Sequence, residues 1–141
     1  GNLSGILDRC IIPENMRGEF CYCPDWESVL RHRFESIILD VPCSGTGTFY
    51  KHPELKYIFR DSRKMEMEQM RLLEKTAEFA TIGAQIFYMT CTLNPLENEK
   101  LTAGFCARSK GAFRMDHSTT ILPSGNLSSG GFLSILREGQ S

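Results

Sequence analysis

The 141-residue sequence lacks the features that would place it in a membrane or exported class. No apolar run reaches the length of a bilayer-spanning helix, and no basic region followed by an apolar core opens the chain. The formal net charge is -1, so the overall charge balance gives no sign of a nucleic-acid binder. These absences predict one globular domain with no membrane partner, in the cytoplasm, or in the nucleolus or an organelle if the source is eukaryotic.

The sequence also lacks the pattern of a metal site. Cys21 and Cys23 form a C-x-C pair, but no second pair of cysteines or histidines completes a zinc site. Without an export signal, the six cysteines are expected to be reduced thiols rather than disulfides. No bound metal is therefore expected.

The apolar pattern predicts an α/β domain from its first half. Residues 34–41 are apolar and β-branched, as in a strand that is buried on both faces. A helix is predicted over about 61–80, ended by Gly83, and a second buried strand over 85–89.

The second half continues the alternation. Asn94 as N-cap and Glu97 three residues later predict a helix that runs to about residue 108. The Ser/Gly-rich stretch 124–131 is predicted as a flexible loop, and 132–136 as a closing strand. Strand, helix, strand, helix, strand predicts a parallel sheet with right-handed crossovers.

The domain organisation predicted from these elements has three parts. Residues 1–33 give no readable pattern, 34–137 carry the predicted strands and helices, and 138–141 form a tail.

Both predicted strands end in groups that can do chemistry. The first ends with Asp40 and, after Pro42, with Cys43, and the second ends with Cys91. Ligands of open α/β sheets bind outside the carboxyl ends of the strands, so neighbouring strands would bring two thiols and one carboxylate into one crevice. The alternative is that both cysteines are small buried hydrophobic residues, the usual environment of a free cysteine. The pattern leaves both interpretations open.

Three other site types do not fit the spacing. A phosphatase loop of the C-x-x-x-x-x-R type needs arginine at 49, which is Phe49. The glycines at 45 and 47 are not followed by the lysine and hydroxyl residue of a Walker loop. No histidine stands where a cysteine protease would need its base.

Four segments together resemble the RsmB/Sun family of RNA (cytosine-5) methyltransferases. D-V-P-C-S-G-T-G-T at 40–48 and T-C-T-L-N-P-L-E-N-E at 90–99 resemble its two signature motifs. K-H-P-E-L-K-Y at 51–57 resembles the segment between them, and G-F-L-S-I-L-R at 131–137 resembles the closing strand. The similarity covers roughly Phe34 to Arg137, and the two signature motifs occur in order.

The resemblance implies the C-terminal part of a Rossmann-like class I methyltransferase sheet, with S-adenosylmethionine as methyl donor and ribosomal or transfer RNA as partner. It assigns Cys91 as the nucleophile that adds to C6 of cytosine, and Cys43 as the group that assists breakdown of the adduct. Asp40 would approach both the cofactor and the base. Asp25 would meet the adenine of the cofactor. The basic segment 51–64 would contact phosphates, or form an ordinary solvated surface.

The chain also departs from the family. The glycine-rich cofactor loop, which precedes the two signature motifs in the family, is not found in 1–33. One interpretation is therefore that a partner chain supplies the part of the domain that carries this loop. Two other functions stay open: an RNA-binding scaffold that keeps the fold without a complete cofactor site, and a cysteine-based redox or acyl-transfer enzyme. The second lacks a C-x-x-C pair and an ordered base.

Overall fold

A computed structural model describes residues 33–49, 51–57, 62–124 and 129–139. They lie within one compact unit, Arg33–Ser141. Asp25 and the Cys21–Cys23 pair lie outside the described residues.

Four strands form one sheet in the order β1-β2-β4-β3. Their bounds are β1 Phe34–Asp40, β2 Ala80–Thr90, β3 Phe113–Ile121 and β4 Gly131–Glu138. β1 and β2 are parallel, as expected, but β4 runs antiparallel to both β2 and β3. The expectation of a parallel sheet is therefore wrong for its second half. The link from β3 to β4 is too short for the crossover that parallel strands need.

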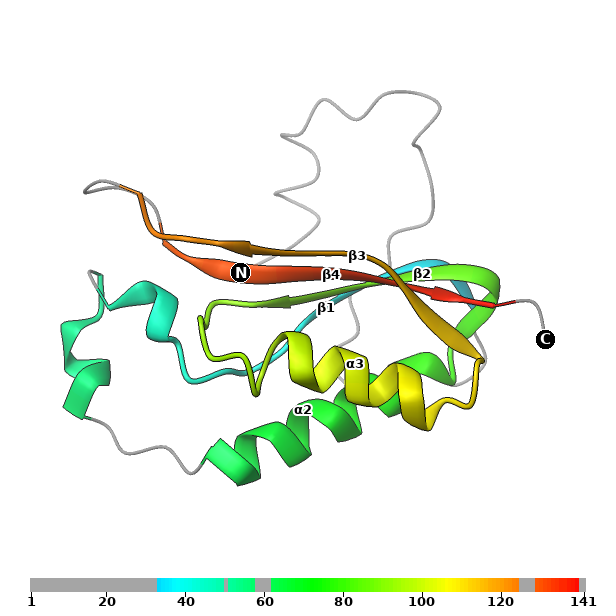
Figure 1. The fold of residues 1–141 in the computed structure, drawn as a ribbon, viewed down its shortest axis with the longest axis horizontal. Coiled ribbons are helices and arrows are strands. Elements are labelled where there is room, and N and C mark those ends of the chain that lie inside the picture. The colour runs from blue at the N-terminus through cyan, green and yellow to red at the C-terminus, as the bar shows by residue number, and fades with distance from the viewer. Residues whose placement is uncertain (1–32, 50, 58–61, 125–128, 140–141) are drawn as a thin grey trace. The chain divides into compact units, whose positions relative to one another are not determined.

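Two helices cover one face of this sheet (Figure 1). The helix α2 spans Ser62–Ala77 and contacts β1 and β2, while α3 spans Glu99–Arg108 and contacts α2, β3 and β4. Two short 3-10 turns, η3 at Thr46–Thr48 and η4 at Pro53–Tyr57, lie between β1 and α2. Within the described ranges, no helix has the length and apolar character that crossing a membrane requires.

The hydrophobic core lies between the helices and this covered face. Ile86 of β2 pairs with Leu136 of β4, and both are fully buried against Leu73 of α2. Phe105 of α3 packs on Phe113 of β3, with ring centroids 5.2 Å apart. Burying each such side chain contributes about 1.5–3 kcal/mol, so the core holds the helices on this face.

The opposite face of β1 is exposed. Ile37 and Leu39 pack against the core, whereas Ile38 between them is 74% exposed. The prediction that 34–41 is buried on both faces is therefore wrong. Because β1 is the last strand of the described sheet and the helices cover one face only, alternate side chains reach solvent.

Several predicted element ends are also wrong. Gly83 does not end the helix: it lies within β2 at φ 80°, where the pairing with β1 is irregular. The second helix begins at Glu99, because residues 95–98 form a turn. β3 was not predicted at all, and the Ser/Gly loop expected over 124–131 lies partly outside the described residues, with Gly131 beginning β4.

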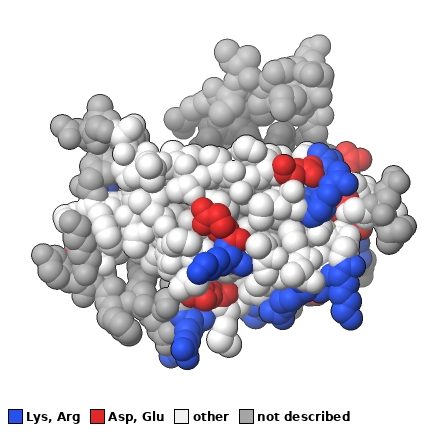
Figure 2. Space-filling model, viewed as in Figure 1, with Lys and Arg blue, Asp and Glu red and all other residues white. Residues whose placement is uncertain are grey.

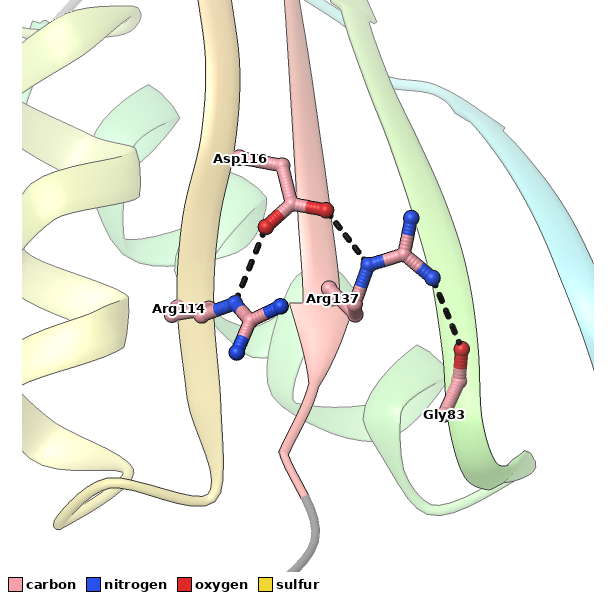
Figure 3. Close-up of polar contacts among 4 residues, drawn as sticks. All are labelled: Gly83, Arg114, Asp116 and Arg137. Atoms are coloured by element: carbon pink, nitrogen blue, oxygen red, sulfur yellow. Dashed lines mark hydrogen bonds and ion pairs between the residues drawn. The ribbon is translucent and has the colours of Figure 1, made fainter.

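Charged side chains join three strands at the end of the sheet where β2 begins (Figure 3). Asp116 of β3 accepts hydrogen bonds from Arg114 Nε at 3.0 Å and from Arg137 Nε of β4. Arg137 Nη1 also donates to the carbonyl of Gly83 in β2 at 3.4 Å. The two arginines, Arg137 first, hold the pKa of Asp116 below its usual value. A hollow lined by Gly83, Arg114 and Arg137 lies here, at the opposite end of β2 from Cys91.

Candidate active site

The carboxyl ends of β1 and β2 lie side by side, and this places two loops next to each other. Asp40 pairs with Met89 in the sheet, and the N–H of Val41 donates to the carbonyl of Met89 at 3.2 Å. Because the strands are parallel, the chain leaves both at the same edge. The loop after β1 carries Cys43, and the loop after β2 begins with Cys91.

The two loops bring the predicted cysteines together. Cys43 Sγ lies 2.8 Å from Cys91 Sγ, and the N–H of Cys91 donates to Cys43 Sγ at 3.3 Å. Both are free thiols, Cys43 buried and Cys91 exposed. Of this pair, Cys91 is therefore the sulfur that a ligand can reach.

Burial determines the protonation of Cys43. Burial and then the hydrogen bond with Cys91 raise the pKa of Cys43 from 9.0 to about 12. At neutral pH Cys43 is thus a thiol, and its S–H can be donated to the sulfur of Cys91. The pair is one protonated, enclosed sulfur beside one accessible sulfur.

Hydroxyl groups fasten the two loops together. Thr92 Oγ1 lies 2.7 Å from Ser44 Oγ and 2.8 Å from Thr46 Oγ1. Thr46 Oγ1 also accepts a hydrogen bond of 2.8 Å from the N–H of Leu93. Thr92 is fully buried, so these bonds form away from water and resist separation of the loops.

Gly47 lies where three backbone segments meet. Its N–H donates to the carbonyl of Cys91 at 3.0 Å, and its carbonyl accepts from the N–H of Gly130 at 2.8 Å. A Cβ at this position would lie 2.3 Å from the carbonyl oxygen of Gly130 and 2.8 Å from that of Cys91. Only glycine fits, which gives a physical reason for the glycine at this position within the first signature motif.

A buried acid and amide support the same loops, and the sequence did not single them out as site residues. Glu97 Oε2 accepts hydrogen bonds of 2.9 Å from the N–H of Ser44 and from Gln69 Nε2. The hydroxyl of Tyr88 donates to the carbonyl of Glu97 at 2.8 Å. Glu97 was interpreted only as part of a helix cap. A signal for Gln69 was present, because it lies four residues before Leu73 and so shares the buried face of α2.

Of the two acids predicted for the site, the structure describes only Asp40. Asp40 is exposed, and within the described part of the chain its carboxylate forms no hydrogen bond with either cysteine. It follows Leu39, which packs on the core, so the alternation of β1 directs it to the other face. Asp25 lies outside the described residues. No cluster of His, Cys, Asp or Glu suited to a metal ion occurs among the residues that are described.

The surface charges are mixed in sign. Figure 2 shows acidic and basic side chains close together on the viewed face. The ion pairs of the described residues include Arg71–Glu68 at 2.8 Å and Arg108–Glu74 at 2.9 Å. The viewed face therefore has no extended basic area.

Comparison with solved structures defines the class of protein. The structure of a methyltransferase homolog protein from Pyrococcus horikoshii has a TM-score of 0.62 and 26% sequence identity, covering 79% of this chain and 41% of that chain. The structure of NSun6 from P. horikoshii with SFG has a TM-score of 0.65 and 21% identity over 78% of this chain and 31% of that one, a likeness of fold alone. The described sheet, with cysteines at the carboxyl ends of its parallel strands, thus has the Rossmann-like fold of a methyltransferase.

The family follows from a direct match. The model of the family described as 16S rRNA methyltransferase RsmB/F matches residues 14–126. The chain belongs to this family, which confirms the resemblance inferred from the two signature motifs.

Curated relatives show the same relationship over part of their length. The tRNA (cytosine(34)-C(5))-methyltransferase of Drosophila melanogaster is 33% identical over 93 residues, which are 64% of this chain and 12% of the relative. The ribosomal RNA small subunit methyltransferase B of Thermus thermophilus is 41% identical over 78 residues, 54% of this chain and 20% of the relative. The chain therefore spans a minor part of these proteins.

Proposed function

We propose that the natural polypeptide carrying this sequence transfers a methyl group from S-adenosylmethionine to C5 of a cytosine in RNA, through a covalent bond between Cys91 and the base. One observation supports this most: two thiols lie 2.8 Å apart, and the exposed one is Cys91. The named activities of relatives, which are cytosine-C5 and ribosomal RNA methyltransferases, support the choice of reaction.

Cys91 makes the first step possible. C5 of cytosine is a weak nucleophile, and addition of the Cys91 thiolate to C6 changes this. The S–C6 bond forms, the C5=C6 π electrons shift to form C4=C5, and the C4=N3 π electrons move to N3, which takes up a proton. The resulting enamine can direct its electrons from C5 to a methyl group.

Cys43 acts when the adduct breaks. After methyl transfer, the protons on N3 and on C5 pass to solvent, the C5=C6 bond re-forms and the S–C6 bond breaks. The electron pair of that bond leaves with the sulfur of Cys91. Cys43 remains protonated at neutral pH because its pKa is raised to about 12, so its S–H can stabilise the departing thiolate.

The methyl donor requires a site at the same edge of the sheet. S-adenosylmethionine, when bound, supplies an electrophilic methyl group on a positively charged sulfur. Asp40 is exposed at this edge, and its carboxylate has no hydrogen-bonding partner among the described residues, so it fits a cationic ligand. Asp25 is proposed to meet the adenine. Asp40 would also bond to the target base while charge develops on the ring.

The RNA is proposed to be ribosomal or transfer RNA. Lys51 and His52 are exposed beside η4, and Arg63 and Lys64 are exposed at the start of α2. Basic side chains of this kind contact phosphates and fix the register of a nucleic acid. A reducing compartment such as the cytoplasm would keep both thiols free for the reaction.

A further strand is proposed to pair with β1. β1 is the edge strand of the described sheet, and Ile38 on its uncovered face is 74% exposed. An exposed apolar edge strand is a template for pairing. The added strand, from the same polypeptide or from a partner chain, would bring the rest of the cofactor site beside Asp40.

The experiment uses the natural polypeptide, unmethylated ribosomal and transfer RNA, and methyl-labelled S-adenosylmethionine. Labelled 5-methylcytidine is expected after nuclease digestion, and the Cys91→Ala variant should form none. A product labelled at another base or at the ribose would contradict the proposal, as would full activity of Cys91→Ala.

A further inference from the structure

The peptide that carries Cys43 is held on both sides by buried side chains. Before the cysteine, the carbonyl oxygen of Pro42 accepts a hydrogen bond of 2.9 Å from Gln69 Nε2. After the cysteine, the N–H of Ser44 donates a hydrogen bond of 2.9 Å to Glu97 Oε2. The two holding groups also bond to each other, at 2.9 Å. Side chains from α2 and from the turn before α3 thus enclose one short stretch of the loop after β1.

Neither holding group is accessible to solvent. Glu97 and Gln69 are both 0% exposed. Glu97 Oε1 accepts a further bond of 3.0 Å from Asn94 Nδ2. Burial alone would raise the pKa of Glu97, but the bonds donated by Ser44, Gln69 and Asn94 outweigh it and lower that pKa. The group is therefore an ionised carboxylate whose donors cannot be removed without leaving a buried charge unpaired.

The orientation of the Gln69 amide follows from its partners. Its nitrogen faces two acceptors, the carbonyl of Pro42 and the carboxylate of Glu97, and only the NH₂ group can serve both. Its Oε1 is buried without a hydrogen-bonding partner. The side chain of Gln69 thus donates two hydrogen bonds while its own oxygen accepts none, so its contribution at this position is as a donor.

We propose that Glu97 and Gln69 are positioning residues for the reaction, which hold the Cys43 peptide from both sides and keep its thiol against the sulfur of Cys91. Because they are fully buried, they cannot touch the substrate, and they act on the reaction through the peptide that carries Cys43. The role in the reaction rests on the proposed function, whereas the holding of Cys43 is a property of the folded chain.

The first test needs no enzymatic activity. Cys43 and Cys106 are alkylated with iodoacetamide in the folded 141-residue chain, and each modified peptide is quantified by mass spectrometry. Glu97→Gln places an NH₂ group where an acceptor is required, and Gln69→Met removes both donated bonds while keeping a similar length. Glu99→Gln is the matched control, because Glu99 accepts from Thr120 on the surface and does not contact the loop.

The variants at Glu97 and Gln69, which together form the clamp on the Cys43 peptide, should each increase the alkylation rate of Cys43 about tenfold or more, because each loses at least one buried hydrogen bond. The rate at Cys106 should stay unchanged, because that cysteine lies in the last turns of α3, where it packs against the hydrophobic core. Equal acceleration at both cysteines would mean general loosening of the fold and would overturn the proposal. An unchanged rate at Cys43 in both variants would overturn it as well.

The second test uses the natural polypeptide with RNA and the methyl donor. Glu97→Gln and Gln69→Met should accumulate the protein–RNA adduct as Cys43→Ala does, with kcat lowered and KM for RNA little changed. A merely structural role would lower adduct and product together. If Cys43→Ala itself traps no adduct while the alkylation result holds, the proposed function fails and the clamp stands. If Cys43→Ala traps adduct and neither clamp variant does, the clamp fails.

Discussion

The sulfur atoms of Cys43 and Cys91 lie 2.8 Å apart although 48 positions separate the two residues in the chain. The relationship depends on the parallel pairing of β1 and β2, which end at the same edge of the sheet. The two thiols differ in burial: Cys43 is buried and Cys91 is exposed. The predictions below test this difference, the loop packing that maintains it, and the sheet that carries it.

The raised pKa of Cys43 predicts that the chain loses stability in alkaline solution. Above pH 9.0, the ordinary value, the unfolded thiol ionises, whereas the folded one holds its proton until about pH 12. The free energy of unfolding should therefore fall as pH rises through this window, by up to about 1.4 kcal/mol per pH unit for this one group. Tyr88 adds to the fall, because burial and then the charge of Glu97 raise its pKa as well.

Urea unfolding of the wild type and Cys43→Ala at about pH 7.5 and about pH 9.5 measures this effect, since urea gives the free energy of unfolding at each pH. The wild type should lose more stability between the two conditions than the variant does. Equal losses would show that Cys43 is not protected from ionisation in the folded chain.

Gly47→Ala should destabilise the chain by about 2 kcal/mol or more, because the added Cβ meets backbone that cannot move cheaply. The contacts are the carbonyl oxygens of Gly130 and Cys91, at 2.3 Å and 2.8 Å. Gly104→Ala is the control: it lies in α3, where the nearest atom, in Met70, is 3.8 Å away. That change should stabilise the helix by about 0.5–1 kcal/mol. Urea unfolding that shows the same sign for both variants would contradict the loop packing.

The Asp116 contacts in Figure 3 predict a stability difference that depends on acid pH. Arg137 and Arg114 lower the pKa of Asp116, so its contribution is present above the ordinary value of 3.8 and is lost as pH falls through the lower folded value. Asp116→Asn should therefore lower the melting temperature at neutral pH, with little difference from wild type at about pH 2. Glu78→Gln, which removes one exposed ion pair with Lys75, should have a smaller effect. A difference that persists undiminished in acid would indicate another cause.

The exposed face of β1 predicts self-association and weak cofactor binding by the 141-residue chain alone. Ile38→Lys should reduce association in sedimentation experiments, because charge on an edge strand opposes pairing. Met67→Lys is the control, since Met67 is 72% exposed on α2 and Ile38 is 74% exposed on β1. Calorimetry should detect little binding of S-adenosylmethionine. A monomeric wild-type chain, or tight binding of the donor, would contradict the need for a further strand.

The sequence predicted the parts of the fold that are encoded locally. The apolar stretches that became β1, β2 and β4 and the apolar face of α2 are periodic, and turn residues bound them, so their positions could be inferred. β3 could not be found in this way, because Phe113–Ile121 is polar at most positions and becomes a strand through pairing with β4. The antiparallel direction of β4 could not be predicted either, because it follows from the pairing of β4 with β3.

In the candidate site too, the features that a local sequence pattern encodes were predicted, and those that depend on distant contacts were not. Cys43 and Cys91 follow strand ends, and a neighbouring parallel pair brings such positions together without further information. The roles of Gln69 and Glu97 depend on contacts between α2 and two loops, which no local pattern encodes. Asp40 was expected to converge with the thiols; it ends β1 at the same edge of the sheet and is exposed, and its role in the site stays a prediction.

The most direct test of the account compares two single variants of the natural polypeptide, each incubated with RNA and S-adenosylmethionine and run on a denaturing gel. Cys43→Ala should retain the attack and accumulate a protein–RNA adduct, because the thioether to Cys91 survives loss of the fold. Cys91→Ala should show neither adduct nor methylated product. An adduct trapped by Cys91→Ala but not by Cys43→Ala would reverse the roles of the two sulfurs, and no adduct from either would leave both as structural thiols.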